Sequence, residues 1–148
     1  MKHEIRSEID IEAPPEAVWA QLADLGRYEE WNPFITRAEG TAEAGQRLKL
    51  RMQPSGGRAM TIRPTVTSAS QGSAFEWLGH LGVPGVFDGR HQFELSPTAT
   101  GTHVVQRESF RGVLVRPLRK SLDTGTLAGF EAMNAALRQR VLESQSAE

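Results

Sequence analysis

The fold is indicated most clearly by residues 11–34, which read IEAPPEAVWAQLADLGRYEEWNPF. Pro14 and Pro15 suit the start of a helix, because a proline in the first helical turn loses no hydrogen bond there. Apolar residues then recur at helical spacing. The second half of residues 11–34 predicts a tight helical turn that ends before Pro33. The stretch therefore predicts two short helices that end in an aromatic corner.

The aromatic corner, YEEWNPFI at residues 28–35, allows two interpretations. Asn32 and Pro33 are typical turn residues, which indicates a corner that locks one end of the fold. Trp31 and Phe34 would, in the other interpretation, project towards a ligand, because aromatic rings provide flat apolar walls. We expect a mainly structural corner whose aromatic residues also reach the rim of a cavity.

Strand patterns surround these helices. Residues 3–12 alternate between isoleucine and charged residues, which predicts a strand with one solvent-facing side. Further strands are predicted at residues 46–53, 59–68, 73–81, 87–95 and 101–112. Pro64 interrupts the second of these and predicts an edge or a bulge. Successive strands without helices between them favour an antiparallel meander.

The last part of the chain changes to a helical period. Between Leu118 and Val141, apolar residues recur at steps of three, four or a multiple of these, which predicts a long amphipathic helix. A curved antiparallel sheet of about six or seven strands would be covered by this helix on its concave, apolar face. We therefore predict a single α+β domain over residues 1–148, with a cavity between the sheet and the helix.

Composition excludes several classes of function. The formal net charge of −1 gives no indication of nucleic-acid binding, and the absence of cysteine excludes disulfides and thiol chemistry. The alternating N-terminus is not a signal peptide, and no window approaches the roughly 18 apolar residues of a membrane span. We expect a cytoplasmic protein without nucleic-acid partners or stable membrane insertion.

Sequence motifs for cofactors and metals are also missing. The four histidines form neither HxH nor HExxH spacing, and GxSxG, the P-loop and GxGxxG do not occur. We therefore predict neither a metal site nor a cofactor. Arg111, Arg116, Arg119 and Lys120 form the only basic cluster, which we interpret as a solvated face; the alternative is contact with an anionic ligand head or a phosphate surface.

Taken together, these patterns resemble the START-like superfamily, also called SRPBCC, and within it the polyketide cyclase/dehydrase-like group. Beyond residues 11–34 and Gly45 of AGQRLKL, the similar segments are FEWLGHL (75–81), GRHQFEL (89–95), QRESFRG (106–112) and GFEAMNAALR (129–138). The resemblance covers nearly the whole chain and implies the Bet v 1-type helix-grip fold. Members of the superfamily bind lipids, sterols, polyketides, hormones or quinones, and some catalyse cyclisations.

Two titratable residues are expected on the inner face of the sheet. Arg107 and Ser109 prefer solvent, so alternation turns Glu108 inwards, and His91 shares an inward alternation with Phe93. A buried carboxylate is costly unless it is paired. We therefore consider three roles for Glu108: a structural carboxylate that is satisfied by His91, an arginine or water; a polar contact that recognises a ligand; or, together with His91, a catalytic acid–base couple.

The leading hypothesis is non-covalent binding of a small hydrophobic or aromatic ligand, such as a lipid or a polyketide. The candidate contacts are Trp31, Phe34, Met52, Met60, Trp77, Phe87, His91, Phe93, Gln106, Glu108, Phe110, Leu122, Phe130 and Met133. A second hypothesis is a cofactor-independent cyclase, dehydratase or isomerase that uses Glu108 and His91 as acid and base. A third is a protein-binding module, which predicts an exposed apolar patch instead of a deep pocket. We expect a monomer or a homodimer.

Overall fold

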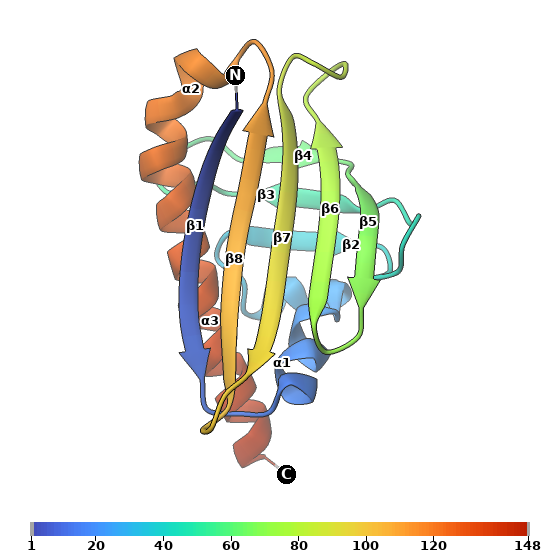
Figure 1. Ribbon diagram of the computed structural model, residues 1–148, viewed down its shortest axis with the longest axis vertical. Helices are drawn as coiled ribbons and strands as arrows, with labels where there is room; N and C mark the ends of the chain where they lie inside the picture. Colours follow the sequence, from blue (N-terminus) through green and yellow to red (C-terminus); the bar gives the residue numbers. More distant parts are fainter. Residues whose placement is uncertain (1, 148) are drawn as a thin grey trace.

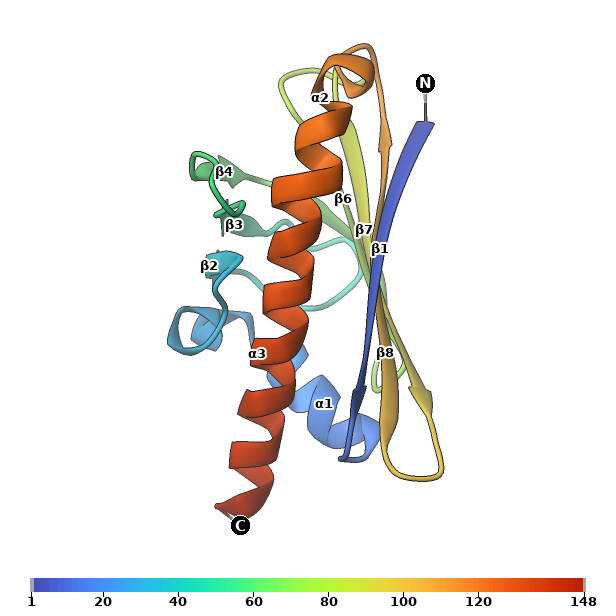
Figure 2. The same cartoon turned by 90° about the vertical axis from the view of Figure 1, so that its left-hand side faces the viewer.

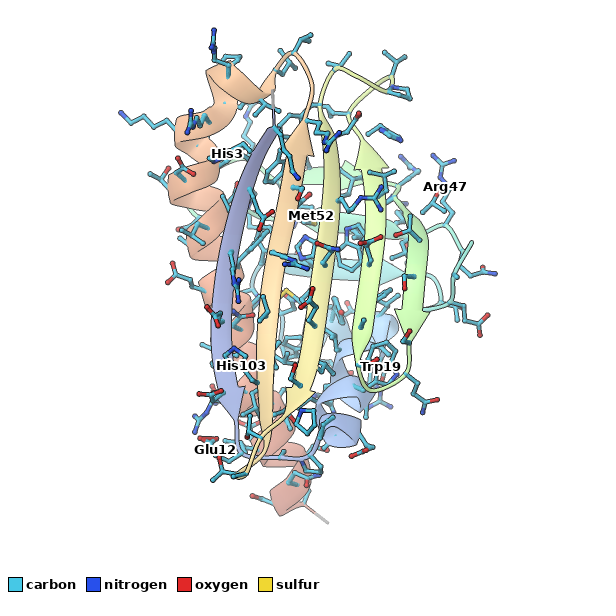
Figure 3. All side chains as sticks on the ribbon, viewed as in Figure 1. His3, Glu12, Trp19, Arg47, Met52 and His103 are labelled. Atoms are coloured by element: carbon cyan, nitrogen blue, oxygen red, sulfur yellow. The ribbon has the colours of Figure 1, made fainter. Side chains whose placement is uncertain are left out.

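A computed structural model describes residues 2–147 of the chain. Its main layer is a five-stranded antiparallel sheet with the strand order β1-β8-β7-β6-β5 (Figure 1). The strands are β1 (Lys2–Ile11), β5 (Thr65–Ser70), β6 (Ala74–His80), β7 (Asp88–Pro97) and β8 (Thr102–Arg111). Polar side chains cover the outer face of this sheet (Figure 3). On this face, His103 Nδ1 of β8 lies 2.7 Å from Asp10 Oδ1 of β1.

A second, smaller sheet has the order β2-β3-β4 and is also antiparallel. It consists of β2 (Ile35–Glu39), β3 (Lys49–Met52) and β4 (Met60–Ile62). Its strands run across those of the large sheet and lie behind them in Figure 1. The small sheet and the C-terminal helix lie on the same face of the large sheet (Figure 2). The concave face is therefore covered by the helix on its β1 side and by the small sheet further across.

Two short helices follow β1, as predicted. They are α1 (Pro15–Leu22) and the 3-10 helix η1 (Leu25–Glu30). The C-terminal helix consists of α2 (Val115–Ser121), a π-helical turn η2 (Leu122–Thr126) and α3 (Leu127–Ser146), which continue one another over 32 residues. These elements confirm the predicted α+β helix-grip class: a curved antiparallel sheet, a long C-terminal helix and two short helices after the first strand.

Two features of the strands differ from the sequence prediction. The segment 59–68, predicted as one strand, is divided into β4 and β5, which belong to different sheets. Pro64 lies at the division, since it has no N–H for a sheet ladder, and its carbonyl accepts a bond from Leu48 N at 2.8 Å. Strand β2 was not predicted, because a bulge between Ile35 and Arg37 disrupts the period of two on which recognition of a strand depends.

The aromatic corner is held by its polar groups. Asn32 is buried, and its Oδ1 accepts hydrogen bonds from Phe34 N at 2.9 Å and from Ile35 N at 2.8 Å. Tyr28 is buried in the same corner and donates its hydroxyl to Leu22 O at 2.5 Å. Burial raises the pKa of the Tyr28 hydroxyl, which keeps it a donor. These bonds give the corner a structural role.

Replacing Asn32 by alanine is expected to lower the free energy of unfolding by about 1–2 kcal/mol, because two buried backbone N–H groups lose their acceptor. Asn32→Asp is the matched control. It retains the accepting oxygen and replaces Nδ2, a buried atom without a hydrogen-bond partner among the described residues, by a second carboxyl oxygen. Chemical denaturation would compare the free energies of unfolding of the two variants. A loss of stability with aspartate as large as with alanine would contradict the role of Asn32 Oδ1 as the acceptor of the two backbone bonds.

Candidate functional site

A cavity of about 430 Å³ lies between the large sheet, the connection from β3 to β4, and the helical segment α2–η2. It occupies the half of the molecule that contains α2 (Figure 1). The predicted contact residues that line it are Phe34, Met52, Met60, Trp77, Phe87, Glu108, Phe110 and Leu122. Aromatic rings form much of the wall, and the rings of Phe87 and Phe110 are stacked with centroids 5.3 Å apart.

The other predicted contact residues lie outside this lining. They are Trp31, His91, Phe93, Gln106, Phe130 and Met133. Phe130 shows the reason, since its ring packs 5.4 Å from Phe34 and 4.9 Å from His91, and so fills the space between helix and sheet. Alternation along a strand predicts which side chains face inwards. It does not predict at which level of the sheet the interior is filled by side chains from the helix.

Part of the lining was not predicted at all. The connection from β3 to β4 contributes Pro54 through Arg58, and η2 contributes Thr124 through Thr126. Ser55 N donates to Gly125 O at 3.2 Å, and a Cβ on Gly125 would lie 2.7 Å from Ser55 O. Gly125 is therefore the residue from which this contact could have been predicted, because a glycine inside a helix indicates close approach by another segment. The π-helical turn at this position is of a kind often found at functional sites.

Glu108 introduces a carboxylate into this mainly apolar wall. Its side chain is 12% exposed and belongs to the cavity lining. A Cβ on Gly89, in the neighbouring strand, would overlap the carboxylate, so the glycine provides the space that Glu108 occupies. Glu108 Oε1 lies 3.0 Å from Nδ1 of His91, its cross-strand neighbour. The structure thus brings together the two residues predicted as an acid–base pair.

His91 reaches the cavity only through Glu108. The imidazole is completely buried and stacks on the indole of Trp77, with centroids 4.6 Å apart and an interplanar angle of 16°. The ring of Phe93 lies 4.9 Å away on another side. Apolar rings therefore surround the histidine and leave its two nitrogens for hydrogen bonding within the sheet.

A chain of buried polar groups continues from His91 into the helix. His91 Nε2 lies 2.9 Å from Gln106 Oε1, and Gln106 Nε2 donates to Asn134 Oδ1 at 2.8 Å and to Phe130 O at 3.4 Å. Asn134 Nδ2 in turn donates to Ser7 Oγ at 2.8 Å. Residues from β1, β7, β8 and α3 are joined in this way beneath the cavity.

The direction of these bonds fixes the tautomer of His91. The carbonyl of Phe130 can only accept, so the amide nitrogen of Gln106 must face it and the amide oxygen must face His91. Nε2 of His91 therefore carries a hydrogen. The neutral ring then has no proton on Nδ1, so the 3.0 Å contact with the Glu108 carboxyl group requires one shared proton. The pair is either imidazolium with carboxylate or neutral imidazole with carboxylic acid.

This bonding predicts that His91 is protonated at Nε2 wherever the protein is folded. A long-range ¹H–¹⁵N NMR spectrum would test it, with the exposed His80 and the half-buried His103 for comparison. We expect the Nε2 resonance of His91 in the range of a protonated ring nitrogen. A neutral His91 with its hydrogen on Nδ1 would contradict the assigned direction of the chain.

Within residues 2–147, no group of histidine and carboxylate side chains is arranged to hold a metal ion. No helix in that range is both long and apolar enough to cross a membrane.

Comparison with known sequences identifies one family. A family model described as "Polyketide cyclase / dehydrase and lipid transport" matches residues 2–142. A comparison with the curated proteins finds no match.

Solved structures share the fold at low sequence identity. TTHA0849 from Thermus thermophilus has a TM-score of 0.77 at 21% identity, covering 96% of this chain and 99% of its own. The Zhui aromatase/cyclase of Streptomyces sp. R1128 has a TM-score of 0.77 at 16% identity, with 95% and 94% covered. A norcoclaurine synthase of Thalictrum flavum, solved with a transition-state analogue, has a TM-score of 0.74 at 15% identity, with 98% and 97% covered.

Proposed function

Because this chain belongs to the polyketide cyclase/dehydrase and lipid transport family, we propose that its cavity binds a small, mainly apolar ligand without forming a covalent bond. The observation that supports this most directly is the cavity of about 430 Å³, a volume within the range of sites for small molecules. Its aromatic walls suit a flat or ring-containing ligand, and the Glu108 carboxyl group provides a polar contact.

The proton shared with His91 determines what Glu108 offers to a ligand. As a carboxylate, Glu108 accepts a hydrogen bond from a hydroxyl group; as a carboxylic acid whose proton faces His91, it still has an accepting oxygen. In both forms the carboxyl group favours a ligand that donates a hydrogen bond. We therefore propose a ligand with an apolar ring system or chain and a hydroxyl or enol group at the end that reaches Glu108.

The proposal is tested in two steps. Mass spectrometry of freshly purified protein, under native and then denaturing conditions, would detect a co-purified small molecule. The neutral fluorescent probe N-phenyl-1-naphthylamine would then report whether the cavity takes up an apolar compound. We expect saturable binding of the probe. A protein that carries no compound and takes up no probe would overturn the proposal.

Variants locate the binding within the cavity. Leu122 is buried and lines the cavity, so Leu122→Trp is expected to weaken probe binding at least about tenfold by filling the space. Leu142→Trp makes the same change on α3 of the same C-terminal helix, outside the cavity lining, and should leave binding unchanged. Thermal unfolding would verify that both variants fold. Equal probe binding by the two variants would contradict binding at this cavity.

A second function, cofactor-independent cyclisation, dehydration or isomerisation, is favoured by the contact between Glu108 and His91. In this reaction the Glu108 carboxylate would take a proton from an acidic C–H or O–H of the substrate and return it to another substrate atom, so no oxidant or reductant is required. His91, buried behind it, would hold the balancing charge. The cavity would keep the substrate folded so that the reacting atoms lie close together.

Poly-β-ketone substrates with chromatographic detection of products would test this second function. We expect a bell-shaped dependence of rate on pH in the wild type and a loss of about 10²–10⁴-fold in Glu108→Gln. Glu108→Gln should still bind N-phenyl-1-naphthylamine, which depends on the apolar walls. Unchanged product formation in Glu108→Gln would rule out the carboxylate as the acid or base, whereas ligand binding would be unaffected by that result.

A further inference from the structure

The exposed large apolar side chains of residues 2–147 gather at one end of the molecule. We define this apolar rim by Met60, Leu81, Val83, Val113, Leu114 and Leu118. Val113 and Val83 protrude most, with exposed fractions of 75% and 64%. The rim extends over β4, the β6–β7 connection, the β8–α2 connection and α2, at the α2 end of the molecule in Figures 1 and 2.

The two connections of the apolar rim are joined by backbone hydrogen bonds. Val113 N donates to Gly85 O at 3.1 Å, and Leu114 N donates to Val86 O at 3.0 Å. A Cβ on Gly112 would overlap the backbone of Val86, which shows how closely these connections approach each other. The protruding valines are therefore presented by one supported platform instead of by two independent loops.

Cationic side chains without acidic partners surround the apolar rim. Arg58, Arg111, Arg116, Arg119 and Lys120 are exposed, and within residues 2–147 none of them forms an ion pair.

Two acidic side chains at the same end lie beside histidines. Asp88 Oδ1 lies 2.7 Å from His80 Nδ1, and Asp123 Oδ1 lies 2.6 Å from His3 Nε2. Figure 3 shows His3 at this end of the molecule, beside the C-terminal helix. The five exposed cations around the apolar rim outnumber Asp88, Asp123 and the exposed Glu4 of β1, so the charge there is positive, although the net charge of the whole chain is −1.

We propose that the apolar rim and its cations dock on the surface of an anionic phospholipid bilayer. Apolar side chains at protruding tips can enter the headgroup layer, while arginine and lysine nearby contact lipid phosphates. Met60, Leu81 and Leu118 belong both to the apolar rim and to the cavity lining. A docked molecule would thus turn the mouth of its cavity to the bilayer, where an apolar ligand enters or leaves with little exposure to water.

Co-sedimentation with vesicles tests this proposal on the full chain without any ligand. The vesicles contain phosphatidylcholine alone or phosphatidylcholine mixed with phosphatidylglycerol. We expect binding to the anionic vesicles to be about tenfold or more stronger, and to weaken as salt is added. Equal binding to both kinds of vesicle, or binding to neither, would overturn the proposal and leave the proposed binding of a ligand in the cavity unaffected.

Matched variants separate the apolar and the cationic contributions. Val113→Asp should abolish most of the binding to anionic vesicles, because it places a carboxylate at the most exposed tip of the apolar rim. The double variant Arg116→Glu/Arg119→Glu should weaken binding about tenfold or more. Arg47→Glu reverses one exposed cation that lies outside the apolar rim, beside β5 at the edge of the large sheet opposite α2 (Figure 3), and should leave binding nearly unchanged.

Two further outcomes would overturn the docking assignment. Wild-type binding by Val113→Asp would show that the apolar rim is not the contact surface. A homodimer that Val113→Asp dissociates, without vesicle binding by the wild type, would assign the rim to a second copy of this chain. Analytical ultracentrifugation at the protein concentration of the vesicle experiment distinguishes this dimer from docking on a bilayer.

Discussion

Replacing Gly129 by alanine is expected to lower the free energy of unfolding by about 2–3 kcal/mol. In most helices the same change is favourable by about 1 kcal/mol, because alanine is the better helix former. At Gly129 a Cβ would overlap the ring of Phe34. That ring is buried and packs edge-on against Phe130, with centroids 5.4 Å apart, so it cannot move aside without disturbing the core.

Gly26→Ala is the control for the prediction that alanine destabilises the protein at Gly129, although it stabilises most helices. Gly26 lies in η1, is exposed, and would place its Cβ more than 4 Å from other atoms. We expect this variant to be neutral or slightly more stable. Urea denaturation of both variants would test the comparison, and equal or greater stability of Gly129→Ala would show that Phe34 can be displaced. Because Phe34 lines the cavity, Gly129→Ala should also change probe binding.

The period of each segment was enough to predict the fold class. Inward positions on β8, such as Gln106 and Phe110, follow directly from the outward preference of Arg107 and Ser109. Strand β2 was missed because its bulge breaks the alternation. The division between β4 and β5 was only partly anticipated, since Pro64 predicts an interruption but not that the following strand joins another sheet.

The position of the cavity could be predicted only in part. Trp77 and Phe93 both alternate inwards, yet only Trp77 lines the cavity. Whether an inward side chain lines the cavity depends on which residue of the C-terminal helix lies opposite it. Long-range packing sets this arrangement, and the alternation within one strand carries no information about it. Phe130 fills the level of Phe34 and His91, whereas η2 opposes the level that remains open.

The polar chain below the cavity combines the structural and the catalytic interpretation of Glu108. Glu108 is satisfied by His91, as the structural interpretation predicts, and it also lines the cavity, as the functional one requires. Alternation predicted that Gln106 and His91 face inwards, but the partner Asn134 lies on α3 and was not predicted. A buried amide pair between sheet and helix therefore fixes that Nε2 of His91 carries a hydrogen.

Replacing Gln106 by leucine is expected to lower the free energy of unfolding by about 3–4 kcal/mol, although the side-chain volume changes little. His91 Nε2–H would lose its acceptor and Asn134 Oδ1 would lose its donor, and both groups are buried. Gln92→Leu is the matched control. Gln92 bonds to Glu76 and Arg107 through a half-exposed side chain, so water can replace these partners and the expected loss is below about 1 kcal/mol.

The Gln106→Leu variant should also move the proton of His91. Without an acceptor at Nε2, the neutral ring is free to carry its hydrogen on Nδ1 and to donate it to the Glu108 carboxylate. The ¹H–¹⁵N spectrum would then show Nε2 without a proton, whereas Gln92→Leu should leave the wild-type pattern. Equal stability of the two variants, with an unchanged spectrum, would mean that Gln106 does not position the proton. A large loss of stability with a moved proton would instead establish Gln106 as the residue that sets which form of the pair faces the cavity.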